Sequence, residues 1–328
     1  MELLTAVGLL LLGFVLLIKG ADFLVEGASA VAKKFGISDI IIGLTVVSMG
    51  TSAPELVVSI GAAMDGNTGI VFGNVIGSNI ANTCLILGVA GLIYPLVVQR
   101  NTAFIELPIS MLIIVAVYVL SNDARIWGSS QNVMSRMDGI LLLLVFAAFL
   151  FYVFRNSKKE PETDEIITPM PGWKSALFIA GGLTGLILGG NWVVDNAVFI
   201  ASKMGMSDRL IGLTIIAIGT SLPELATSAI AALKKNSDIA IGNVIGSNVF
   251  NILLVLATSS TIMPTIYDTK INWDLFFLLA ATVVLFIFLF IGTRRKGNHF
   301  TLDRWQAGIL LVAILSYYTY LVLTDTGI

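Results

Sequence analysis

Charged residues, cysteine and histidine are all scarce in this 328-residue sequence. Asp, Glu, Lys and Arg make up 12% of the chain, whereas soluble domains carry roughly a quarter. The single cysteine, Cys84, has no partner in the chain, which excludes an intramolecular disulfide. A Cys/His metal site is also excluded, because His299 is the only histidine. No basic patch with interleaved aromatic residues indicates a nucleic-acid partner.

Hydrophobic residues, by contrast, make up 56% of the chain. Apolar runs of about 20 residues, which is long enough to span a bilayer, recur along the whole sequence. The first residues, MELLTAVGLLLLGFVLLIKG, lack the basic leader and small-residue cleavage site of a secretory signal, so we expect a retained first span. The composition therefore predicts an all-α, multi-pass protein of the cell membrane, with the lipid bilayer as its solvent.

Hydropathy predicts ten transmembrane helices, five on each side of a polar segment at 156–172. That segment contains three prolines and charges of both signs, which is typical of a flexible linker. It separates a first half, residues 1–155, from a second half, residues 173–328. The expected spans lie at about residues 3–32, 38–64, 69–93, 102–120, 136–155, 173–202, 207–232, 238–262, 273–291 and 304–323.

The two halves are copies of each other, related by a constant shift of 169 residues. GLTVVSMGTSAPEL at 43–56 returns as GLTIIAIGTSLPEL at 212–225, and GNVIGSN at 73–79 returns unchanged at 242–248. Each half holds five spans, an odd number, so the second half is expected to enter the membrane upside down relative to the first. Inverted repeats of this kind are the architecture of secondary transporters.

The distribution of basic residues predicts the orientation of the chain. Connections after odd-numbered spans carry thirteen Lys and Arg residues, and those after even-numbered spans carry five. Cytoplasmic loops are enriched in Lys and Arg. We therefore expect the central linker in the cytoplasm and both termini on the extracytoplasmic side.

Two glutamates, Glu55 and Glu224, lie well inside expected spans at matching positions of the repeat. A carboxylate in the bilayer core costs about 2.5–3.5 kcal/mol on insertion scales, so such residues are usually functional. The prolines that precede them, Pro54 and Pro223, remove a backbone hydrogen bond, which predicts a short unwound stretch followed by a new half-helix. Carbonyl, hydroxyl and carboxylate oxygens at such a break are ligands for calcium, magnesium or alkali cations. The alternative is a pair of protonated or hydrogen-bonded structural glutamates.

Further oxygen donors follow in the repeated GNVIGSN blocks. Ser78 and Asn82 are four residues apart, as are Ser247 and Asn251, so each pair shares one helical face. These side chains either add ligands to the same cavity or form hydrogen bonds between helices. The glycines of the blocks fit close helix packing.

These motifs resemble the two alpha-repeats of the calcium/cation antiporter superfamily, and more narrowly its prokaryotic sodium/calcium exchanger branch. The resemblance covers the whole chain and implies sodium-for-calcium exchange by alternating access, without a cofactor. It implies a calcium site made by the carboxylates of Glu55 and Glu224 and the carbonyls of Thr51 and Thr220. It also implies sodium sites around it that use Ser52, Ser78, Ser221, Ser247 and the backbone carbonyl of Ala217, with Asn82 facing the central position. Some family members carry Asp where this chain has Asn251, a pattern typical of potassium-dependent exchangers.

Other functions remain open at this stage. A proton-coupled or potassium-dependent antiporter would use the same fold, and a cation channel would conduct without a counter-ion. An intramembrane enzyme would need a second, asymmetric catalytic residue beside the glutamates, and the sequence supplies none. Because each half supplies half of the site, a monomer suffices.

Two weaker patterns complete the predictions. Lys19 and Asp22 are spaced to pair on one helical face. Gly181, Gly185 and Gly189 form a stripe of small residues, which predicts tight packing or a smooth sliding surface.

Overall fold

The computed structural model describes residues 2–126, 128–155, 170–205, 217–292 and 300–326, almost all of them in helices. The α-helices are α1 (Glu2–Phe35), α2 (Asp39–Ile42), α3 (Ser48–Thr51), α4 (Ala53–Met64), α5 (Thr68–Ile80), α6 (Leu87–Ile93), α7 (Leu107–Ser121), α8 (Asp123–Ile126), α9 (Arg136–Arg155), α10 (Gly172–Lys203), α12 (Ala217–Gly219), α13 (Leu222–Leu233), α14 (Ser237–Phe250), α15 (Ala257–Ile262), α16 (Asn272–Ile291) and α17 (Arg304–Thr326). Wider π-helical turns form η1 (Gly43–Val47), η2 (Ala81–Ile86), η3 (Thr102–Glu106) and η5 (Asn251–Leu256), and η6 (Thr269–Ile271) is a 3₁₀ turn.

Eight helical segments in the described part of the chain are long and apolar enough to cross a membrane. A further pair, Asp39–Thr51 and Ala53–Met64, is long and apolar enough only when its two helices are taken together, and they meet at a bend of 46°, as in a broken span or a re-entrant loop. The remaining expected span, 207–232, falls partly outside the described residues, and its described part contains the apolar helix α13.

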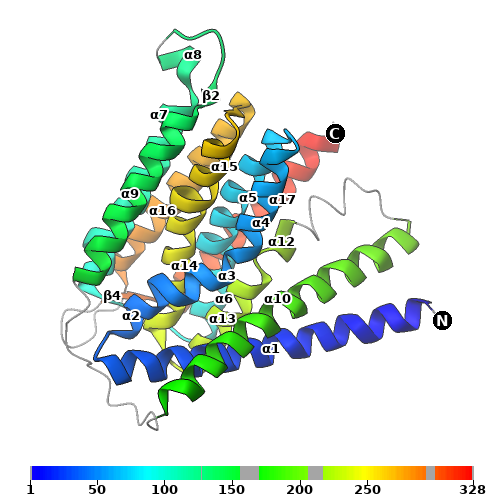
Figure 1. Cartoon of the computed structure of the whole chain (residues 1–328), viewed down its shortest axis with the longest axis vertical. Coiled ribbons are helices and arrows are strands. Elements are labelled where there is room, and N and C mark those ends of the chain that lie inside the picture. Colours follow the sequence, from blue (N-terminus) through cyan, green and yellow to red (C-terminus); the bar gives the residue numbers. More distant parts are fainter. Residues whose placement is uncertain (1, 127, 156–169, 206–216, 293–299, 327–328) are drawn as a thin grey trace.

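Two long helices, α1 and α10, pack side by side and run across the remaining bundle at a steep inclination (Figure 1). Their backbones touch at glycines: a Cβ added to Gly182 would lie 2.7 Å from the carbonyl oxygen of Gly20. The same addition to Gly189 would lie 2.7 Å from the carbonyl oxygen of Gly13. Small residues permit such an approach between membrane helices.

The glycine stripe is therefore placed differently from the sequence prediction. Gly185 and Gly189 do face α1, but a Cβ at Gly181 would meet nothing within 4 Å, and Gly182 takes its place in the contact. Four-residue steps drift around a helix of 3.6 residues per turn, so three residues at that spacing do not stay on one narrow face.

The rest of the chain forms a bundle centred on α5 and α14 with their π-helical continuations η2 and η5. Of the eight long apolar segments in the described residues, Ser237–Ile262 is the most enclosed, with 89% of its apolar stretch buried. α14 packs against η1, α2 and α3 of the first half, and a Cβ at Gly242 would lie 2.7 Å from the carbonyl oxygen of Ile40. The centre of the bundle is thus a contact between the two halves.

Two small antiparallel sheets join the halves at opposite ends of the bundle (Figure 1). β1 (Leu96–Val98) pairs with β4 (Phe300–Leu302), and β2 (Val133–Met134) pairs with β3 (Thr265–Ile266). Each sheet takes one strand from each half of the chain.

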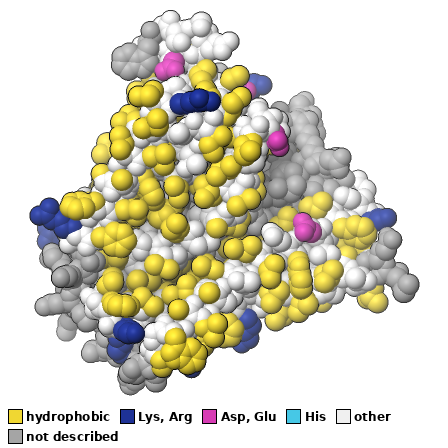
Figure 2. Space-filling model, in the orientation of Figure 1, with side chains coloured by type: hydrophobic (Ala, Val, Ile, Leu, Met, Phe, Trp, Pro, Cys, Tyr) yellow, Lys and Arg dark blue, Asp and Glu magenta, His cyan; other side chains and the backbone are white. Residues whose placement is uncertain are grey.

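The surface matches a lipid environment. Figure 2 shows hydrophobic side chains spread over the flank of the bundle, with Lys and Arg gathered toward its ends. Many large apolar side chains are well exposed, among them Leu4, Val57 and Phe151, at 80%, 72% and 67%. In water such a surface would promote aggregation, whereas lipid covers it without cost.

Candidate functional site

A helix break lies at the position that the prolines predict. In the first half α3 ends at Thr51, Ser52 leaves helical geometry with φ -84° and ψ 8°, and α4 begins at Ala53 with Pro54 in its first turn. In the second half Ser221 has φ -89° and ψ 6° before α13 begins at Leu222. In the first half the break is narrower than expected from the sequence, because only Ser52 leaves the helix while Thr51 remains helical. In the second half α12 ends at Gly219, so Thr220 and Ser221 both lie in the break.

The breaks put both glutamates in the first turn of a half-helix, Glu55 in α4 and Glu224 in α13. Their exposed fractions are 0% and 1%, and the two carboxylates are close enough to interact electrostatically. The first turn of a helix favours negative charge, because unpaired backbone N–H groups point at it. The fold therefore concentrates two buried carboxyl groups in one place between the halves.

Hydroxyl groups from the opposite half accompany each carboxylate. Ser52 Oγ donates a hydrogen bond of 3.0 Å to Glu224 Oε1, and Thr51 lies beside the same carboxylate. Glu55 has Thr220 of the second half and Ser78 of α5 as neighbours. Five of the expected site residues are thus brought together by contacts between the halves, and Ser78 joins them from the same half as Glu55.

The other expected residues are buried on neighbouring elements: Asn82 in η2, Ser247 in α14, Asn251 in η5 and Ser221 at the second break. Ala217 opens α12, and its side chain lies outside the described part of the structure. Among the described side chains, no hydrogen bond links these residues directly to the carboxylates, so their membership of the site stays a prediction.

Many polar atoms in this region have no hydrogen-bond partner among the described residues. They are Glu55 Oε1 and Oε2, Glu224 Oε2, Ser78 Oγ, Ser221 Oγ, Ser247 Oγ, Asn251 Oδ1, and both amide atoms of Asn82. A buried polar atom without a partner costs about 1–3 kcal/mol, so native proteins rarely tolerate one, and a cluster needs an explanation. Nearly all of these atoms are oxygens, which are the donors that hard cations prefer.

Two further asparagines support the site and were not predicted from the sequence. Asn74 Nδ2 donates to the carbonyl oxygen of Glu55 at 3.2 Å and to Ser59 Oγ at 2.9 Å. Asn243 Nδ2 makes the same two bonds, at the same distances, to Glu224 and Ser228. The sequence did contain an indication of them, because the 169-residue shift maps Asn74 onto Asn243 and Ser59 onto Ser228.

Asn243 has an additional role, because its Oδ1 accepts a 3.0 Å hydrogen bond from Thr51 Oγ1. It therefore connects the turn that carries Glu224 to the break in the first half.

The expected pairing of Lys19 with Asp22 is wrong. Asp22 instead forms a 2.6 Å salt bridge with Lys234, which follows α13. Lys234 Nζ also donates to the backbone carbonyl of Asp22 at 3.2 Å. Asp22 thus pairs with a lysine far along the chain instead of the nearby Lys19, and residue spacing alone could not predict this pairing.

The structure also limits the kind of metal site. No group of three or more His, Cys, Asp or Glu side chains occurs among the residues that the structure describes. A cation held between Glu55 and Glu224 would therefore complete its shell with neutral hydroxyl, amide and carbonyl oxygens.

Comparison with known proteins identifies the family. The sodium/calcium exchanger protein family matches residues 5–155 and 174–324. The sodium/calcium exchanger MaX1 of Methanosarcina acetivorans is 31% identical over 347 residues, covering 95% of this chain and 97% of MaX1. The inner membrane protein YrbG of Escherichia coli is 38% identical over 272 residues, covering 80% of this chain and 81% of YrbG.

A solved structure of the sodium-calcium exchanger NCX_Mj, soaked with sodium and strontium, has the same fold. It superposes with a TM-score of 0.80 at 32% identity, covering 98% of each chain. The chain is an all-α, multi-pass membrane protein and belongs to the sodium/calcium exchanger family.

Proposed function

We propose that this protein is a secondary active antiporter that exchanges sodium for calcium by alternating access. The observation that carries the proposal is the buried pair Glu55 and Glu224, near oxygen atoms that have no hydrogen-bond partner in the described part of the chain. Two carboxylates balance the charge of one divalent cation. The membership of this chain in the sodium/calcium exchanger family supports the same activity.

The calcium ligands in this proposal are the Glu55 and Glu224 carboxylates together with the backbone carbonyls of Thr51 and Thr220. Thr51 lies directly before the helix break at Ser52, and Thr220 lies beside Ser221 in the break of the second half. Calcium accepts six to eight oxygen ligands in flexible geometry, which suits a site of mixed carboxylate and carbonyl oxygens.

Sodium would bind around the same centre. The proposed ligands are the hydroxyls of Ser52, Ser78, Ser221 and Ser247, the backbone carbonyl of Ala217, and the side-chain oxygens of Asn82 and Asn251. Sodium and calcium then share Glu55 and Glu224 as counter-charges, so binding of one ion weakens binding of the other. Such competition is the basis of exchange.

We also propose ten spans arranged as two inverted five-helix repeats, in halves 1–155 and 173–328 joined by the linker 156–172. The 169-residue shift carries β1 onto β3 and Gly36, with φ 63°, onto Gly205, with φ 83°. The sheets containing β1 and β3 lie at opposite ends of the bundle, as inverted copies should. The termini would be extracytoplasmic, and one copy of the chain would be sufficient for transport.

Alternating access would require two parts that move relative to each other. The backbone contacts between α1 and α10 support movement of this pair as one unit against the bundle. The bundle itself is tied together by the two cross-half sheets.

Calcium-45 uptake into proteoliposomes tests the function, with sodium, proton and potassium gradients imposed one at a time. An outward sodium gradient should drive saturable uptake, and E55Q and E224Q should each abolish it. The control is E26Q, which makes the same change on an exposed residue of α1. Uptake driven at full rate by a pH gradient alone would favour proton coupling, and uptake without any counter-ion would favour a channel.

A further inference from the structure

The asparagines beside the candidate site are bonded differently in the two halves, although the sequence repeats them. Asn251 Nδ2 donates a 3.0 Å hydrogen bond to Asn79 Oδ1. The 169-residue shift maps Asn79 onto Asn248 and Asn82 onto Asn251, so the equivalent bond would run from Asn82 Nδ2 to Asn248 Oδ1. That bond is not formed, and both of its atoms are buried without a hydrogen-bond partner among the described residues.

One residue explains the difference. Asn248 Nδ2 donates instead to Thr83 Oγ1 at 2.9 Å, and this hydrogen bond fixes the orientation of the Asn248 amide. The shift maps Thr83 onto Ile252, which has no hydroxyl. Asn79 therefore has no competing acceptor at that position; its Nδ2 donates to the Asn248 backbone carbonyl at 3.1 Å and its Oδ1 accepts from Asn251.

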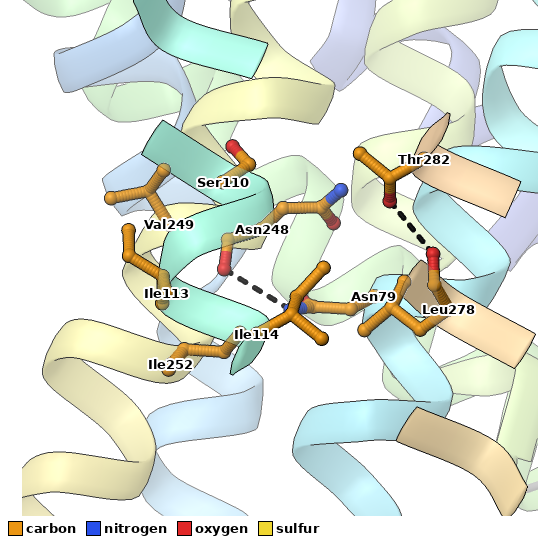
Figure 3. Close-up of a pocket in the computed structure, with 9 residues that line it drawn as sticks. All are labelled: Asn79, Ser110, Ile113, Ile114, Asn248, Val249, Ile252, Leu278 and Thr282. Carbon is orange, nitrogen blue, oxygen red and sulfur yellow. Dashed lines mark hydrogen bonds between the residues drawn. The ribbon is translucent and has the colours of Figure 1, made fainter. Parts of the chain in front are cut away.

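Space for the alternative arrangement lies next to these residues. A small cavity between α5, α7, α14 and α16 is lined by Asn79 and Asn248 and by the hydroxyl residues Ser110 and Thr282 (Figure 3). Asn248 lies at the wall of this cavity, so its side chain is not packed tightly on every side.

We propose that Thr83 is a positioning residue that makes the two halves of the ion site unequal. By holding Asn248, it leaves the Asn82 amide free to reorient around a bound ion, while Asn79 keeps Asn251 fixed. The inference rests on the proposed function and adds an assignment to it: Asn251 is the preset ligand and Asn82 the adaptable one. A fixed ligand saves the ordering cost of binding, whereas a free ligand releases its ion more readily.

The substitution T83V tests this assignment, because it removes the hydroxyl and keeps the shape of the side chain. Asn248 should then turn to Asn82 and fix it. In the sodium-driven uptake assay, the half-saturating calcium concentration should fall about threefold, within the range for immobilising one side chain, and the maximal rate should fall as well. T83S, which retains the hydroxyl, should have the half-saturating calcium concentration and maximal rate of the wild type.

Two further variants test whether Thr83 acts through Asn248 and whether a hydroxyl has the same effect in the second half. If the effect acts through Asn248, T83V should change nothing in an N248L background, which is a double-mutant cycle. I252T places a hydroxyl at the matching position of the second half, so it should draw Asn79 from Asn251 and raise the half-saturating concentration.

The outcomes separate this inference from the function on which it rests. A half-saturating concentration in T83V that stays the same or rises, or an undiminished effect of T83V in the N248L background, overturns the role of Thr83. Absence of sodium-driven uptake in the wild type would overturn the exchanger function instead.

Discussion

Replacing Asn243 with leucine is expected to destabilise the protein and weaken calcium binding, because this side chain connects three parts of the site. It donates to the Glu224 carbonyl and to Ser228, and it accepts from Thr51. Three hydrogen bonds at a net value of about 0.5–1.5 kcal/mol each imply a loss of about 2–4 kcal/mol in unfolding free energy. Burial of the leucine side chain offsets a part of this loss.

The matched control is N74L at the equivalent position of the first half. Asn74 makes only two of these bonds and is half-buried, whereas Asn243 is fully buried. Its loss should therefore cost about 1–3 kcal/mol, because one hydrogen bond fewer is removed.

Thermal unfolding of the purified protein in detergent, followed by tryptophan fluorescence, measures the difference. One kcal/mol corresponds to roughly 2–4 °C in chains of 150–250 residues, so N243L should melt several degrees below N74L. The half-saturating calcium concentration should also rise more in N243L. Equal melting temperatures for the two variants would show that the Thr51 bond and the deeper burial contribute nothing, and would refute the reasoning.

Three more predictions follow from charge and packing. Potassium should leave sodium-driven calcium flux unchanged at matched membrane potential, because position 251 is neutral; several-fold stimulation by potassium would contradict this, and N251D would then be informative. G185W should lower turnover more than calcium affinity, because a Cβ there would lie 3.2 Å from Gly20 Cα and a larger side chain would separate α1 from α10, the pair proposed to move as one unit; G181V, facing open space, is the control. D22N should change the melting temperature by little, because an ion pair with Lys234 exposed by about a third is worth about 0–1 kcal/mol; a large drop would show that it ties α1 to α13.

The parts of the site that were predicted from sequence are those set by local chemistry. Pro54 and Pro223 act on the backbone directly, so the helix breaks could be placed from the sequence. The approach of Glu55 to Glu224 could be predicted because the repeat relates them and intramembrane carboxylates seek partners.

The parts that were missed depend on contacts between distant segments. The three bonds of Asn243 and the salt bridge of Asp22 join residues far apart in the chain, and several partners were chemically possible for each. The sequence prediction placed Gly181 in the contact with α1, where the structure has Gly182. The reason is geometric: residues spaced four apart move gradually off the contact line of a helix that has 3.6 residues per turn.

The two small sheets have a consequence for how the chain could be divided. Each strand of one half is completed by a strand of the other, at opposite ends of the bundle. A chain cut at the central linker would leave each half with two unpaired strand edges, and such edges readily recruit another strand. The complementary half would satisfy both edges at once. Two halves expressed separately are therefore expected to associate in the membrane. A half expressed alone is expected to fold less well, because its strand edges stay unpaired.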